Sequence, residues 1–208
     1  MKKLLILILI VVVLLFIGDV WVRGKVEGRL ASGLQESLGS SGDIEVSFGG
    51  FPFVFRALSG NIPAATVRTE RLTRDGLRFT DITMTLRNIR FSLTKVLAGD
   101  LRAIKVGTGD GRAAIDTDAL TKALARSGSQ VDVDVADEIR VSVGGASGTA
   151  EVSIAGNELV LSIESLGRDL EVPLPRVVRG ITYESVEVID SHLELGFSLD
   201  DIRLTGLQ

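Results

Sequence analysis

Apolar and polar residues alternate through much of this 208-residue chain, and this alternation limits what the chain can fold into. Every second residue is apolar in 44–48, 131–135, 139–143, 150–154 and 159–163. Successive side chains of a β-strand point to opposite faces, so these segments are typical of strands with one buried and one solvated face. The glycine-containing turns at 144–148 and 156–157 predict an antiparallel meander.

The alternation shifts by one residue twice between positions 77 and 93. Leu77 and Phe79 are followed by Ile82, Met84 and Leu86, and these by Ile89, Phe91 and Leu93. Such shifts predict β-bulges, which bend and twist a strand. Residues 107–110 lie between two apolar segments, 101–106 and 111–115, and we interpret them as a hairpin turn. A phosphate-binding loop is a weaker interpretation, since no Lys-Ser/Thr pair follows the glycines.

Two segments have the spacing of amphipathic helices. Val26, Leu30, Leu34 and Leu38 recur every four residues and predict a helix over 25–39, with Gly39 as its stop. Asp116 offers an N-cap for a second, shorter helix over 117–127, which Gly128 ends. Together with the strands, these helices predict an α+β fold built on one large antiparallel sheet.

The amino terminus has the form of a secretory signal or a signal anchor. Lys2 and Lys3 precede the uninterrupted apolar segment 4–17, and residues 20–22 resume it after Gly18 and Asp19. No Ala-x-Ala-like cleavage site follows, so we favour an uncleaved anchor with the rest of the chain outside the cytoplasm, or a secreted protein if it is cleaved. We therefore divide the chain into residues 1–22 and one domain, 23–208.

Composition excludes several classes of function. Cysteine is absent and there is one histidine, which removes thiolate nucleophiles, iron–sulfur clusters and His-pair metal motifs. A formal charge of −4 does not favour nucleic-acid binding. We interpret Asp132 and Asp134 as the solvent face of a strand and not as a calcium site. The sequence has no Gly-x-Ser-x-Gly motif to supply a catalytic serine for His192, so we assign this histidine no catalytic role. The sequence thus predicts no catalytic group, metal or cofactor.

Residues 48–55 hold four of the eight phenylalanines. Pro52 can open a short helix and Gly60 can close it. On such a helix Phe51, Phe55 and Leu58 share a face and Val54 lies beside them. Two interpretations stay open: a core plug that joins helix to sheet, or an apolar mouth that touches lipid.

The order of these features resembles the LmeA-like phospholipid-binding proteins of bacterial cell envelopes. The resemblance rests on segment 44–60 with its Gly-x-Pro-Phe block, on Gly76-Leu77-Arg78-Phe79 and the strand to Leu86, and on Leu174-Pro175 before Gly180-Ile181. It implies a fold like the tubular lipid-binding proteins, in which a large curved antiparallel sheet wraps around the long amphipathic helix. It also implies an extracytoplasmic protein that binds phospholipid and supports envelope lipid or glycolipid biogenesis or transport.

The resemblance and the apolar pattern together give candidate site residues. For acyl chains we expect Leu30, Leu34, Phe48, Phe51, Phe53, Val54, Phe55, Leu58, Phe79 and Met84. For head groups we expect Lys25, Arg29 and Arg56. The expected partners are phospholipid and membrane; no protein partner can be named. Two alternatives stay open, an assembly module that packs on an envelope protein and, less favoured, an enzyme acting on envelope lipids or glycans.

Overall fold

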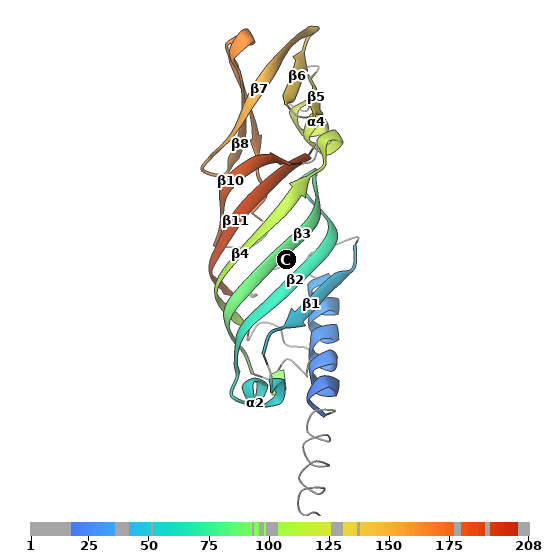
Figure 1. Cartoon of the computed structure of the whole chain (residues 1–208), viewed down its shortest axis with the longest axis vertical. Helices are drawn as coiled ribbons and strands as arrows, with labels where there is room; N and C mark the ends of the chain where they lie inside the picture. The colour runs from blue at the N-terminus through green and yellow to red at the C-terminus, as the bar shows by residue number, and fades with distance from the viewer. Residues whose placement is uncertain are drawn as a thin grey trace, which may run out of the picture.

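The computed structural model describes most of the chain beyond residue 17. The described residues are 18–35, 42–50, 52–92, 94–95, 98, 104–125, 131–136, 138–176, 180–189 and 192–203. The predicted anchor segment 4–17 lies outside them. No helix in the described part is long and apolar enough to cross a membrane. The molecule is elongated, with one sheet at each end and helices beside them (Figure 1).

The larger sheet has six antiparallel strands and curls into a half-barrel (Figure 1). Its order is β1-β2-β3-β4-β11-β10. The strands are β1 (Ile44–Phe48), β2 (Asn61–Arg74), β3 (Leu77–Arg90), β4 (Lys105–Ile115), β10 (Ile181–Ile189) and β11 (His192–Arg203). The alternating burial of β1 confirms the predicted half-buried strand over 44–48.

A second, five-stranded sheet forms the other end of the molecule. It is an antiparallel meander of β5 (Val131–Val135), β6 (Ile139–Val143), β7 (Ala146–Ala155), β8 (Glu158–Ile163) and β9 (Arg168–Pro173). The expected large curved antiparallel sheet is present as the six-stranded sheet, and the predicted meander is confirmed, but the meander forms a sheet of its own, so the expectation of a single sheet is wrong. The helix α4 (Thr117–Ala125) intervenes after β4, and one cluster of buried apolar residues continues through both sheets.

Helices pack where the sequence places apolar stripes. The N-terminal helix is described over residues 18–35 without a break at 22, and buries Val26 and Leu30. Its Glu27 carboxylate accepts a hydrogen bond of 2.8 Å from the Phe48 amide, which ties the helix to the edge strand β1. The short α2 (Phe53–Leu58) begins after Pro52 as predicted. In α4, Asp116 accepts a bond of 3.0 Å from the Ala119 amide, which is the expected cap.

The predicted hairpin turn at 107–110 is wrong, because β4 runs through it unbroken. The glycines serve close packing instead. A β-carbon on Gly111 would lie 2.6 Å from Cζ of Phe197, and one on Gly109 would lie 3.2 Å from Cδ1 of Leu199. Both large side chains come from the neighbouring strand β11. Glycine in β4 thus makes room for β11 to place bulky side chains over it.

The two predicted shifts in β3 are confirmed as backbone irregularities. Asp81 and Asn88 have φ values of 50° and 55°, a left-handed conformation that Asn and Asp tolerate better than most residues. After each of these points the residues that point inward change from one alternate set to the other. Leu86 and Ile89, for example, are three residues apart and both face the cavity described below. The register places Asn88 level with one residue on each of three other strands: Pro63, Gly107 and Asp201. We call these four residues the bend line.

Candidate functional site

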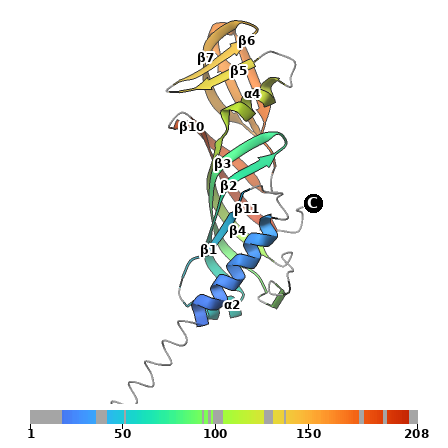
Figure 2. The same ribbon diagram turned by 90° about the vertical axis from the view of Figure 1, so that its right-hand side faces the viewer.

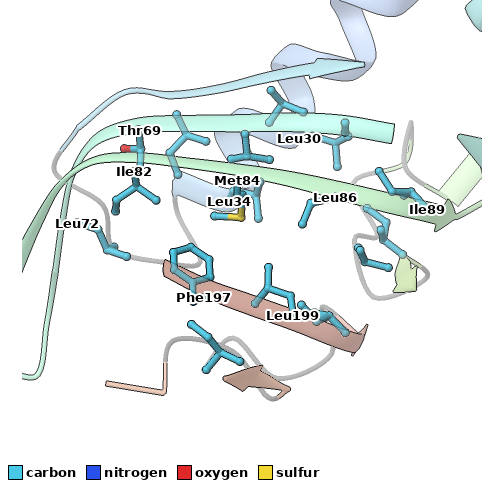
Figure 3. Close-up of a pocket in the computed structure, with 18 of the residues that line it drawn as sticks. Leu30, Leu34, Thr69, Leu72, Ile82, Met84, Leu86, Ile89, Phe197 and Leu199 are labelled. Carbon is cyan, nitrogen blue, oxygen red and sulfur yellow. The ribbon is translucent and has the colours of Figure 1, made fainter. Parts of the chain in front are cut away.

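A cavity lies on the concave face of the six-stranded sheet, against the N-terminal helix. Its volume is about 150 Å³. Figure 3 shows Leu30 and Leu34 of the helix, Met84 and Leu86 of β3, and Phe197 and Leu199 of β11 around the same space. The other described lining residues are Ile44, Val46, Phe48, Ala65, Val67, Thr69, Leu72, Phe79, Ile82, Ile89, Phe91, Ile104, Val106, Ala113, Ile181, Tyr183 and Ile202.

The lining carries no charged side chain among these residues, and only Thr69 and Tyr183 are polar. The Tyr183 hydroxyl donates a hydrogen bond of 2.8 Å to the backbone carbonyl oxygen of Pro175. The Thr69 hydroxyl lies 3.5 Å from the backbone carbonyl oxygen of Arg71. Burial raises the pKa of Tyr183 from 10.0 to about 12, so its phenol stays neutral at ordinary pH. The cavity can therefore accept hydrocarbon without leaving a polar group unpaired.

The groove is long compared with an acyl chain. Its lining on β3 extends from Phe79 to Ile89, which is about 30 Å at about 3.3 Å per residue. One leaflet of a bilayer is about 15 Å of hydrocarbon, half of the full core. An acyl chain laid along β3 would thus fit within the lined length.

The phenylalanine-rich segment divides between the two predicted roles. The rings of Phe48 and Phe53 stack with centroids 5.2 Å apart, and Phe53 is 1% exposed. Phe55 and Leu58, on the other face of α2, are 65% and 69% exposed. The inner face of α2 therefore plugs the body of the protein, while its outer face meets solvent.

The comparison with family models decides the relationship. The model described as LmeA-like phospholipid-binding matches residues 17–208, nearly the whole chain. The chain belongs to the LmeA-like phospholipid-binding family. No curated protein and no solved structure matches it significantly.

The predicted acyl-chain residues of this LmeA-like protein fall into three groups. Five of them line the groove: Leu30, Leu34, Phe48, Phe79 and Met84. Others lie outside the lining: Phe53 is buried behind it, Val54 is half-buried, and Phe55 and Leu58 are exposed. Phe51 lies outside the described residues. The role of each in lipid binding stays a prediction.

The predicted head-group residues lie on the surface of the LmeA-like chain. The Lys25 ammonium is 5.7 Å from the ring centroid of Trp21, within the range of a cation–π contact. A β-carbon on Gly50 would lie 3.4 Å from Nε of Arg56, so this side chain covers the loop before α2. Arg29 is exposed on the N-terminal helix. None of the three lines the groove.

The last two strands contribute to the groove, which was not predicted from the sequence. Ile181 and Tyr183 come from β10, and Phe197, Leu199 and Ile202 come from β11. The signal was present, because Phe197 and Leu199 alternate with polar residues and Tyr183 is the only tyrosine. What the alternation could not show is that β11 pairs with β4.

Proposed function

We propose that this LmeA-like protein holds a phospholipid by its acyl chains in the groove of the six-stranded sheet. The observation that carries the proposal is the uncharged lining, in which both polar side chains face backbone carbonyls. Such a lining suits hydrocarbon and offers no acid–base pair for catalysis. A packed assembly module, the alternative from the sequence, would have a filled interior in place of the groove.

The energetics favour a protein that carries or presents lipid. Burying hydrocarbon from water gains about 0.8 kcal/mol per methylene. A lipid in a bilayer is already out of water, however, so its transfer into an apolar groove changes the free energy little. Exchange between bilayer and groove is then reversible, as lipid transport or presentation requires.

The proposal includes a place in the cell. The basic residues Lys2 and Lys3 and the apolar segment 4–17 support an extracytoplasmic protein held at the cytoplasmic membrane by its amino terminus. A tether of this kind keeps the groove where the lipid concentration is high. The family relationship supports a part in building or moving envelope lipids or glycolipids.

Photo-crosslinking in vesicles tests the groove. The full chain is reconstituted with a phospholipid that carries a diazirine within one acyl chain, illuminated, and digested for mass spectrometry. We expect adducts on β3 residues 77–90 and β11 residues 192–203, and none on the second sheet, 131–173. Adducts confined to the first 17 residues would show contact with the bilayer alone and would refute binding in the groove.

A further inference from the structure

The large apolar side chains that are strongly exposed in the described residues gather at one end of the molecule. Val20 and Trp21 on the first described turn of the N-terminal helix are 55% and 66% exposed, and Phe55 and Leu58 on α2 are similarly open. The buried carboxylate of Asp19 joins the two helices, because it accepts a hydrogen bond of 2.6 Å from the Val54 amide. Figure 2 shows the start of the helix beside α2. We call this region the α2 end.

Cations gather at the same end. The sheet register places Arg90, Lys105 and Arg203 side by side on β3, β4 and β11. Like charges opposite each other on neighbouring strands destabilise a sheet. Arg87, on the same strand as Arg90, is paired with Asp110, but Arg90 and Lys105 are exposed and form no ion pair with another described residue. An external anion would offset their repulsion.

The opposite end of the molecule is acidic. Residues 131–173, which form the second sheet, hold nine Asp and Glu against two Arg, a formal charge of −7. The rest of the chain holds 21 Lys and Arg against 18 Asp and Glu, a charge of +3. The α2 end and the second sheet lie at opposite ends of the long axis (Figure 1). A negative surface would therefore repel the second sheet, which favours an orientation with the α2 end toward that surface.

We propose that the α2 end is a docking surface for the head-group layer of an anionic bilayer, an inference that rests on the proposed lipid-binding function. Trp21 beside Lys25 has the amphipathic character of interfacial aromatic residues. Residue 18 at this end follows directly on the apolar segment 4–17, so a tether would bring this end to the membrane first.

Docking in this orientation would point the groove at the lipid supply. Phe91 lines the groove, and its amide donates a bond of 3.0 Å to the Gly60 carbonyl just after α2. The lining therefore reaches the α2 end. A lipid would enter the groove from the end that faces the bilayer, without crossing bulk water.

A single-tryptophan reporter tests the orientation. Trp21 is the only tryptophan, so Trp21→Phe gives a full chain without tryptophan fluorescence and keeps an apolar aromatic side chain at the α2 end. Phe55→Trp then reports on α2, and Ala155→Trp, at the exposed end of β7, reports on the second sheet. In vesicles of phosphatidylglycerol and brominated phosphatidylcholine, we expect the residue 55 reporter to lose most of its fluorescence and the residue 155 reporter to lose none. Equal quenching at both positions, or none at position 55, would overturn the proposal.

Charge reversal tests the part of the cations. Arg90→Glu with Lys105→Glu should restore the fluorescence of the residue 55 reporter. The matched control, Lys122→Glu with Arg168→Glu, makes the same change in net charge on exposed residues outside the α2 end and should leave the quenching unchanged. If the two pairs of substitutions have equal effects on the quenching, the net charge of the protein explains the result, and the proposed role of the α2 end is refuted.

The crosslinking assay separates this proposal from the proposed function. If groove adducts persist while residue 55 is not quenched, the docking surface is wrong and lipid binding stands. If residue 55 is quenched but no groove adducts form, the groove proposal fails and the docking observation remains. Thermal unfolding of each variant confirms that the fold is retained.

Discussion

Filling the groove with a protein side chain should displace lipid, and Ala65 is the position where the structure makes this clearest. Ala65 is 3% exposed and lies level with Phe48 on β1 and Leu86 on β3, and all three line the groove. Ala65→Leu adds three carbon atoms. If each displaces one methylene into water, binding weakens by about 2.4 kcal/mol, a change of about 60-fold in the equilibrium constant.

The expected readout follows from the balance between groove and bilayer. With the two about equally favourable, a 60-fold change lowers the filled fraction of grooves from about one half to about one sixtieth. Crosslinking in vesicles measures this fraction as adducts on residues 77–90, with adducts on the first 17 residues as the internal standard. The ratio should fall about 30-fold.

The same substitution that weakens lipid binding, Ala65→Leu, should raise the free energy of unfolding. In an empty groove the added carbons gain apolar contact, worth up to about 2 kcal/mol, whereas overpacking a filled core costs about 1–3 kcal/mol. Ala64→Leu is the matched control, because Ala64 is the next residue on β2, is half-buried, and is not part of the lining. A destabilised Ala65→Leu protein with unchanged adducts would refute the reasoning, as would equal losses in both variants.

Three further predictions concern the surroundings of the groove. Phe53→Ser should lower the free energy of unfolding by about 3–5 kcal/mol and the exposed Phe55→Ser by less than about 0.5 kcal/mol; equal effects in denaturant titrations would contradict the two-faced α2. Asp19→Ala removes the hydrogen-bond acceptor of the Val54 amide and should lower the free energy of unfolding by about 1 kcal/mol. Faster amide hydrogen exchange in α2 would show that the loss is local to this helix. Because the pKa of Tyr183 rises from 10.0 unfolded to about 12 folded, the native state keeps its proton longer, and stability should fall from pH 10 to 12. Tyr183→Phe should abolish that fall, and phenolate absorbance near pH 10 in the folded protein would contradict it.

Local features of the fold could be predicted from the sequence. The alternation over 44–48 and 131–163 defines strands, and the shifts around Asp81 and Asn88 locate real irregularities. These signals are local because they depend on the two-residue period of a strand. The prediction for 107–110 failed because it took the glycines as a sign of a turn. Their actual use depends on Phe197 and Leu199, which are distant in sequence.

Pairing between distant strands explains what else was missed. Alternation shows which face of a strand is buried but does not identify its neighbours, so one sheet could not be told from two. The groove residues predicted from the first half of the chain, such as Leu34 and Met84, lie in the lining. The groove residues of β10 and β11 reach the lining because β11 pairs with β4, and no local sequence pattern reveals that pairing.

The bend line restricts how this protein can change length. Pro63, Asn88, Gly107 and Asp201 lie at one level of four strands, and the lining changes its side-chain parity there on β3, β4 and β11. Deleting Asn88 alone would leave Leu86-Arg87-Ile89-Arg90 as a regular alternation and would remove the bend from β3, while the neighbouring strands kept theirs, so β3 would lose its register with them beyond this line. Relatives should therefore tolerate substitutions on this line but not single-residue gaps. An alignment that opens such a gap in one strand only would be misplaced by a residue from there to the strand's end.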